Sequence, residues 1–137
     1  MKKINIFTDG ACKGNPGPGG WGVLIISEDE QVELSGGNKE TTNNQMELIA
    51  VIKSLEYFDN QIEANLYTDS KYVMDGITNY IKNWKVNGWK TANKKPVKNS
   101  ELWKALDSLN DFHNIHRKCD KGHSGHPGNE KAEALAN

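Results

Sequence analysis

The order of its strand-like and helical segments is the feature that most constrains the fold of this chain. Strand-like runs come first, and a glycine- and proline-rich turn at 14–20 separates the first two of them. From about residue 43 onward, helical and strand-like segments alternate. The predicted strands are 3–8, 21–27, 32–36, 64–68 and 115–119, and the predicted helices are 43–58, one that opens at Ser70, 100–112 and one after Pro127. Hairpins followed by β-α-β units predict an α/β fold in which helices cover a mixed sheet.

Length and composition fit one globular domain over residues 1–137. The chain is 36% apolar and 26% charged, which is enough for a core without staples, and no repeat or linker divides it. Cys12 and Cys119 lack metal-ligand spacing, as is usual in a reducing compartment. No apolar run reaches the length of a signal peptide or a membrane span. We therefore expect a cytoplasmic protein, and a monomer because no surplus apolar stripe is visible.

Three acidic residues occupy the ends of predicted elements. Asp9 and Asp69 follow strand-like runs, and Glu47 opens an apolar helical run. Acids at such positions can converge, and they would repel one another strongly unless a hard cation such as Mg²⁺ lay between them. Each acid alone is also explained as a turn former or a helix N-terminal charge. Taken together, they predict a divalent-metal site for a phosphate-containing substrate.

Positive charge is concentrated in one segment, although the net charge is −1. Residues 82–99 contain six lysines and no acid, interleaved with Trp84 and Trp89. Basic residues between aromatic ones are typical of surfaces that bind polyanions. The alternative is a solvated helix and loop. We expect this segment to bind nucleic acid.

The chain resembles type 1 ribonuclease H of the bacterial kind over essentially its whole length. Five motifs carry the resemblance, in the family's order: Ile6-Phe7-Thr8-Asp9-Gly10, the turn 14–20, Thr41-Thr42-Asn43-Asn44, Thr68-Asp69-Ser70 and Gly88-Trp89-Lys90-Thr91-Ala92. The resemblance implies an α/β, ribonuclease H-like fold, a five-stranded mixed sheet with flanking helices. It also implies hydrolysis of the RNA strand of RNA/DNA hybrids, with 3′-hydroxyl and 5′-phosphate ends.

The resemblance gives five residues a catalytic role: Asp9, Glu47, Asp69, His123 and Glu133. The four acids would hold Mg²⁺, or Mn²⁺, as two ions when substrate is bound. One ion would activate the attacking water and the other would stabilise the leaving 3′ oxygen. His123 lies in a glycine-rich loop, where an imidazole that titrates near neutrality would help protonate the leaving group or release product. The alternative is a loop histidine without a task.

A second set of residues would contact the hybrid. Asn43 and Asn44, with the backbone around Cys12 and Asn15, would sense RNA 2′-hydroxyls, although Asn43 could be only a helix N-cap. Thr42 and Asn99 would hold a DNA phosphate. The remaining contacts to the DNA strand are Tyr80, Trp84, Lys85, Trp89, Lys90, Lys94 and Lys95. For both tryptophans, packing within the protein is an equal alternative.

Several positions depart from the family's pattern. Glu133 stands where the family has aspartate, which predicts a weaker second-metal site because Mg²⁺ demands near-octahedral geometry. Arg117 and Cys119 replace two tryptophans of the last strand, which predicts lower stability. The final helix should be short and fray. Val86 and Asn87, usually basic in the family, and Glu40 near the phosphate contacts predict modest hybrid affinity.

Two other functions stay open at this point. A DNA-cutting resolvase or integrase of the same fold would share the acids but would not need the paired asparagines at 43 and 44. A non-catalytic or weakly active hybrid-binding protein is suggested by Glu133 and the altered last strand. Cleavage of duplex DNA would favour the first, and binding without Mg²⁺-stimulated cleavage would favour the second.

Overall fold

The computed structural model of the chain describes residues 4–13, 16–28, 30–68, 70–90 and 97–119, apart from the side chains of 117–119. Its elements are β1 (Ile4–Cys12), β2 (Gly17–Ile26), β3 (Gln31–Thr41), α1 (Asn43–Glu56), β4 (Glu63–Thr68), α2 (Lys71–Asp75), the π-helical turn η1 (Gly76–Tyr80), α3 (Ile81–Val86), α4 (Ser100–Phe112) and β5 (Asn114–Cys119). Among the helices of these ranges, none combines the length and apolarity that crossing a membrane requires. The helix predicted after Pro127 lies outside the described residues.

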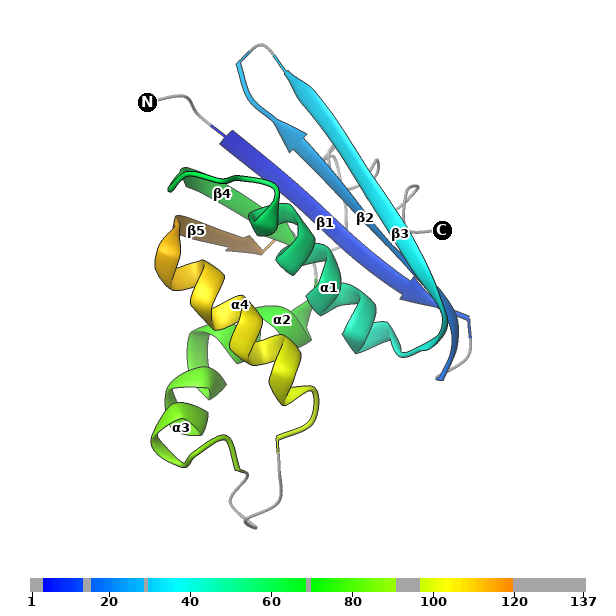
Figure 1. Cartoon of the computed structure of the whole chain (residues 1–137), viewed down its shortest axis with the longest axis vertical. Coiled ribbons are helices and arrows are strands. Elements are labelled where there is room, and N and C mark those ends of the chain that lie inside the picture. Colours follow the sequence, from blue (N-terminus) through cyan, green and yellow to red (C-terminus); the bar gives the residue numbers. More distant parts are fainter. Residues whose placement is uncertain (1–3, 14–15, 29, 69, 91–96, 120–137) are drawn as a thin grey trace.

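A five-stranded mixed sheet forms the centre of the fold, in the order β3-β2-β1-β4-β5 (Figure 1). β1, β2 and β3 pair antiparallel, while β4 joins β1 in parallel and β5 joins β4 in parallel. The change in direction occurs where helices begin to connect the strands, because parallel neighbours need a crossover connection. The predicted five-stranded mixed sheet with flanking helices is confirmed.

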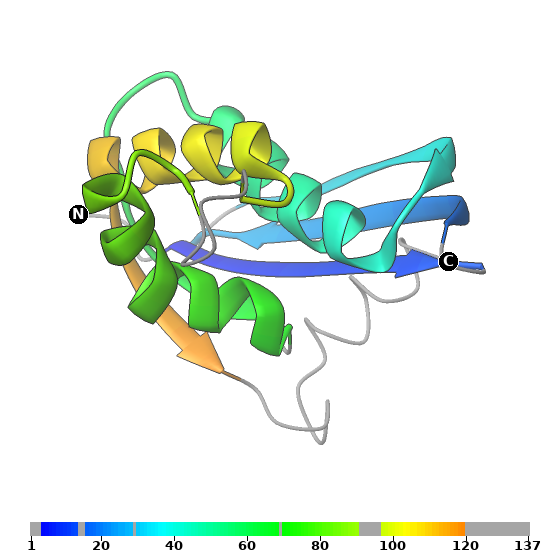
Figure 2. The ribbon, with the colours of Figure 1, turned by 90° about the horizontal axis from the view of Figure 1, so that it is seen from below.

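Helices α1 and α4 lie side by side on one face of this sheet (Figure 2). Alternate residues of the central strands, such as Ile6 on β1 and Leu66 on β4, are buried in one core with the apolar residues of α1 and α4. Phe7 and Tyr67 belong to the opposite face, where their rings stack with centroids 4.9 Å apart. The two faces of β1 therefore pack in two separate apolar clusters.

β1 and β3 are longer than their apolar runs predict. β1 continues through Gly10 to Cys12 because each of these residues pairs with β2, from Asp9 opposite Gly22 to Cys12 opposite Gly19. Asp9 thus lies inside a strand, and its prediction as a strand-end residue was wrong. β3 likewise runs to Thr41 through polar residues that hydrogen bond to β2. Cross-strand hydrogen bonds extended both elements where the side-chain pattern gave no signal.

Helix α1 starts with a capping box. The side-chain oxygen of Thr42 accepts from the Gln45 backbone N–H at 3.2 Å, and the Gln45 Oε1 accepts from the Thr42 backbone N–H at 3.2 Å. The alternative role of Asn43 as the N-cap was therefore wrong, because Thr42 fills that position. Ser70 caps α2 as predicted, with its hydroxyl accepting from Val73 N at 3.2 Å. These caps determine the residues at which α1 and α2 begin.

The helical stretch from α2 to α3 contains a π-helical turn at η1, next to the buried Trp103 of α4. A Cβ built on Gly76 would stand 2.1 Å from the Trp103 ring. Only a residue without a side chain lets η1 pack this closely on the indole, which is fully buried. The contact holds the stretch from α2 to α3 against α4.

Candidate active site and nucleic-acid interface

Asp9 lies on β1 next to the point where that strand touches the first turn of α1. A Cβ on Gly10 would stand 2.5 Å from Glu47 N and 2.5 Å from Met46 C. The backbones of β1 and α1 therefore meet at Gly10, one residue from Asp9 and directly against Glu47. Both acids are nearly buried, with Asp9 8% and Glu47 6% exposed. Two of the predicted metal ligands are thus brought together from distant parts of the sequence.

Strand β4 pairs with only the first part of β1. The β1–β4 pairing ends at Phe7 opposite Tyr67, two residues before Asp9. Asp9 shares the face of Phe7 by the strand's alternation, whereas Glu47 belongs to α1 on the other face. Beyond Phe7, no described strand pairs with β1 on the side of β4. Carboxylates from both faces can approach each other there.

Three of the predicted catalytic residues, Asp69, His123 and Glu133, lie outside the described residues. The described ranges contain Asp9 and Glu47 of the four acids, and within those ranges no group of three or more His, Cys, Asp or Glu side chains could hold a metal ion. Thr68, at the end of β4, is fully buried, and its hydroxyl accepts from Ser70 N at 3.1 Å. The chain on either side of position 69 is therefore held in place.

The residues expected to face RNA gather around the start of α1. Asn43 and Asn44 are exposed in its first turn. Cys12 lies at the end of β1 beside them, where its single S–H is shared between Thr41 O at 3.2 Å and Gly17 O at 3.4 Å from the sulfur. The thiol thus ties the ends of β1, β2 and β3 together. Asn15 lies outside the described residues.

The two residues expected to hold a DNA phosphate are connected through Gln45. Gln45 Nε2 donates to Asn99 Oδ1 at 3.2 Å, and the same glutamine belongs to the capping box of Thr42. Asn99 Nδ2 donates in turn to the Tyr72 hydroxyl at 3.2 Å. Thr42 is the N-cap of α1 and Asn99 that of α4, so two helix N-termini lie next to each other. Their positive dipole ends favour an anion at this place.

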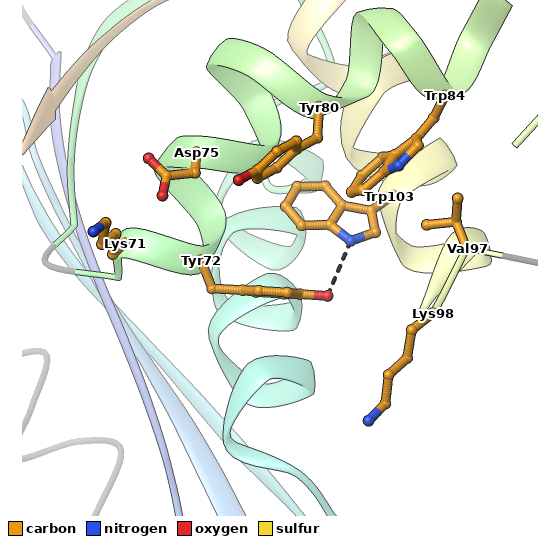
Figure 3. A pocket seen from close by; sticks show the side chains of 8 residues that line it. All are labelled: Lys71, Tyr72, Asp75, Tyr80, Trp84, Val97, Lys98 and Trp103. Carbon is orange, nitrogen blue, oxygen red and sulfur yellow. Dashed lines mark hydrogen bonds between the residues drawn. The ribbon is translucent and has the colours of Figure 1, made fainter. Parts of the chain in front are cut away.

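A pocket of about 610 Å³ opens beside these residues (Figure 3). Its lining consists of Lys71, Tyr72, Asp75, Tyr80, Trp84, Val97, Lys98 and Trp103. Tyr80 is 50% exposed and stacks on Trp84, with ring centroids 5.8 Å apart. Trp84 also packs on Trp103 at 5.4 Å. Packing, one of the two alternatives for Trp84, is thus observed, and the contact of Trp84 with the DNA strand stays a prediction.

Trp89 is held by the protein's own packing. It packs against the core, its carbonyl accepts from Val97 N at 3.0 Å, and its backbone is left-handed with φ of 64°. Lys104 Nζ lies 5.6 Å from the centre of its ring. Packing, one of the two alternatives for Trp89, is thus observed. Lys90 is exposed, and Lys94 and Lys95 lie outside the described residues.

Lys85 is paired within the protein. Its Nζ lies 3.0 Å from Asp107 Oδ2 and 3.8 Å from Asp111 Oδ2 of α4. The hydrogen bond and charge of Asp107 raise the pKa of Lys85 above its ordinary value of 10.5. The segment 82–99 has no acid in sequence, but α4 brings acids to it in space. If Lys85 contacts a DNA phosphate, as the sequence predicts, that phosphate would compete with Asp107 for it.

The substitution Asp107→Asn is expected to strengthen hybrid binding about two- to fivefold at low salt. It removes the carboxylate closest to Lys85, so that the ammonium group can pair with the DNA backbone. Fluorescence anisotropy with a labelled hybrid across a salt series measures the effect. Glu56→Gln is the matched control, since it breaks the exposed Lys53–Glu56 pair and changes the net charge equally. Equal gains in both variants would show that only overall charge matters.

Sequence reasoning missed two residues of this region, Gln45 and Tyr72. The spacing from Thr42 to Gln45 is that of a capping box, so it could have identified Gln45. Tyr72 carries no such signal, because its partners Asn99 and Trp103 are 27 and 31 residues away. Only the packing of α2 against α4 reveals its role.

Comparison with known proteins gives consistent matches along the whole chain. The family model described as RNase H matches residues 1–137. A protein named Ribonuclease H from Alcanivorax borkumensis is 58% identical over 137 residues, which are 100% of this chain and 91% of the relative. Another of that name, from Rhizobium meliloti, is 57% identical over 136 residues, covering 99% of this chain and 89% of the relative.

Solved structures show the same fold. LC9-RNase H1, described as a type 1 RNase H with the type 2 active-site motif, superposes with a TM-score of 0.87 at 29% identity, covering 99% of this chain and 71% of that one. RNase H1 from the halophilic archaeon Halobacterium salinarum superposes with a TM-score of 0.73 at 26% identity, covering 98% and 95%.

Proposed function

The chain belongs to the ribonuclease H family, and from this premise we propose how its residues act. As a member it is an endonuclease that hydrolyses the RNA strand of RNA/DNA hybrids and depends on a divalent metal. We propose which metal it uses, which residues hold that metal and which residues contact the hybrid. The observation that carries this proposal is the meeting of Asp9 and Glu47 at Gly10.

Asp9, Glu47, Asp69 and Glu133 would hold two Mg²⁺ ions, or Mn²⁺ in their place. Asp9 and Glu47 are nearly buried carboxylates, and their hard oxygen donors suit such ions. When bound, the ions supply positive charge that activates a water and stabilises the leaving 3′ oxygen. The products would be 3′-hydroxyl and 5′-phosphate ends.

The chain's own residues would orient the hybrid and move protons. Thr42 and Asn99 would donate to one DNA phosphate, aided by the N-termini of α1 and α4. His123 would pass a proton to the leaving oxygen. Tyr80 and Trp84 would contact the DNA strand from the pocket wall, while Trp89, Lys85, Lys90, Lys94 and Lys95 would contact its backbone. Holding the scissile phosphate at the acids is the purpose of these contacts.

Asn43, Asn44 and the backbone around Cys12 and Asn15 would distinguish RNA from DNA. The 2′-hydroxyl is both a donor and an acceptor, and an amide side chain offers the complementary pair. The exposure of both asparagines in the first turn of α1 supports this assignment. Because these contacts reach sugar and phosphate rather than base edges, cleavage should show little sequence preference.

Cleavage of matched labelled duplexes tests the proposal. Wild-type protein should cut the RNA strand of RNA/DNA in Mg²⁺ or Mn²⁺, should leave RNA/RNA and DNA/DNA duplexes intact, and should lose activity in excess chelator. The ends of the products are identified by their mobility and by ligation. Activity that persists in chelator would remove the metal assignment, whereas cleavage of DNA/DNA would remove the role given to Asn43 and Asn44.

We also propose that the protein acts as a monomer in the cytoplasm. RNA/DNA hybrids form where DNA is copied, and one copy of the chain carries every residue assigned above. Light scattering of the purified protein with and without hybrid measures the oligomeric state. A dimer that persists at the concentration of the cleavage assay would contradict the monomer.

A further inference from the structure

A continuous series of hydrogen bonds runs from the end of β3 to the buried indole of α4. The Thr41 hydroxyl donates to Gln45 Oε1 at 2.9 Å, Gln45 Nε2 donates to Asn99 Oδ1 at 3.2 Å, and Asn99 Nδ2 donates to Tyr72 Oη at 3.2 Å. Trp103 Nε1 donates to the same tyrosine oxygen at 3.1 Å, as the dashed line in Figure 3 marks. Asn99 lies in the middle of this series.

Groups that can only donate stand at both ends, and they determine the direction of every bond between them. The Thr42 backbone N–H donates to the same Gln45 oxygen, so this atom must be the acceptor and the Gln45 amide nitrogen must face Asn99. Asn99 therefore accepts through Oδ1, and its nitrogen faces Tyr72. At the other end the indole N–H of Trp103 can only donate, so Tyr72 Oη accepts there too.

The backbone of Asn99 fits this role. Asn99 is the N-cap of α4, yet its side chain makes no capping hydrogen bond, and its φ of 61° and ψ of 30° are left-handed. Asparagine tolerates this conformation better than most residues. The side chain is thereby turned away from its own helix and toward Gln45 and Tyr72. After both bonds are made, one N–H of Asn99 has no acceptor in the described part of the chain.

We propose that Tyr72 is a positioning residue which, with Gln45, holds the Asn99 amide so that its remaining N–H is presented as a donor to the DNA phosphate. This inference rests on the phosphate contact assigned to Asn99 under the proposed function. Without the tyrosine hydroxyl the Asn99 Nδ2 loses its acceptor, and only the bond from Gln45 Nε2 to Asn99 Oδ1 restrains the amide, so its remaining N–H is held toward the phosphate less firmly. Tyr72 thus contributes to hybrid binding through Asn99.

The test uses a short hybrid with one cleavage site and a set of DNA strands in which single phosphates are replaced by neutral methylphosphonates. The phosphate that Asn99 contacts is the one whose neutralisation raises KM for the wild type but not for Asn99→Ala. Tyr72→Phe keeps the ring and removes the hydroxyl. It should raise KM about three- to tenfold on the unmodified hybrid and leave kcat within about twofold. Neutralising the Asn99 phosphate should then raise its KM little further.

Stability does not test the idea, because Tyr72→Phe also removes the acceptor of the buried Trp103 N–H. The Asn99 side-chain amide resonances in NMR give a readout without substrate, and their protons should exchange faster with solvent in Tyr72→Phe. Tyr57→Phe is the matched control, since that exposed tyrosine lies at the other end of α1, about 18 Å from Gln45. It should change neither KM nor the resonances.

Two results would overturn the inference, and they are distinguishable. If neutralising each phosphate in turn raises KM as much for Asn99→Ala as for the wild type, Asn99 contacts none of them. The phosphate contact is then wrong, and so is the positioning role of Tyr72. If Asn99→Ala identifies a phosphate but Tyr72→Phe raises KM equally on the neutralised and unmodified hybrids, the contact stands and Tyr72 does not act through Asn99. Unchanged amide exchange in Tyr72→Phe would lead to the same second conclusion.

Discussion

Replacing Asp9 by asparagine is expected to lower kcat for hybrid cleavage by about a thousandfold or more, while hybrid affinity stays within a few-fold of wild type. The carboxylate is nearly buried beside Glu47, where a neutral amide cannot help to neutralise a bound cation. Metal ions contribute several kcal/mol to such reactions, and about 4 kcal/mol corresponds to three powers of ten in rate. Steady-state cleavage and anisotropy measure the two quantities.

Urea titration of metal-free Asp9→Asn checks that the variant is folded, so that a loss of kcat is not a loss of structure. Asp59→Asn provides the matched control: it neutralises an exposed acid after α1 and should leave kcat unchanged. An Asp9→Asn protein that keeps more than about a tenth of wild-type kcat would show that Asp9 is not a metal ligand in the reaction.

The substitution Gly10→Ala is expected to damage both stability and activity. The new methyl group would stand 2.5 Å from backbone atoms of Met46 and Glu47, which cannot rotate away as a side chain can. Separating α1 from β1 should lower the free energy of unfolding by about 2–3 kcal/mol. Because Glu47 moves with the helix, kcat should fall about tenfold to a hundredfold in the fraction that stays folded. Urea titration and cleavage under native conditions measure both effects.

Gly36→Ala separates the two consequences. Its methyl group would meet the Trp21 indole at 2.7 Å, on the β2–β3 hairpin, so it should cost stability without moving α1. We expect its kcat to remain at the wild-type value. If Gly10→Ala also kept the wild-type kcat once corrected for unfolded protein, the contact between β1 and α1 would not control the position of Glu47.

Local patterns predicted the elements that depend on nearby residues. Helix α4 covers Ser100–Phe112 as the apolar periodicity predicted, and Ser70 caps α2 as its hydroxyl suggested. Helix periodicity and capping involve residues three or four positions apart, so the sequence displays them directly. The ends of β1 and β3 were misjudged, because their polar and glycine-rich parts are held by pairing with β2.

Some residues of the candidate site were likewise predictable from the sequence, and others were not. Motifs that resemble a family pointed to Asp9, Glu47 and Thr42, whose surroundings the structure describes. The sequence did not reveal that Asp107 of α4 pairs with Lys85, since they are 22 positions apart and lysine is the only charged residue type in the segment 82–99. Charge along the sequence and charge in space differ wherever helices pack together.

The sequence by itself predicted the order of helices and strands, the acidic residues of the site and the resemblance to a family, because residue types and their spacing carry that information. The tertiary structure alone decided that β1 passes Asp9 beyond the end of β4, that Gly10 admits α1, and that Tyr72 and Gln45 hold Asn99 between them. Each of these depends on atoms from elements distant in sequence meeting within a few ångströms. Such meetings follow from packing of the whole chain, which no local pattern contains.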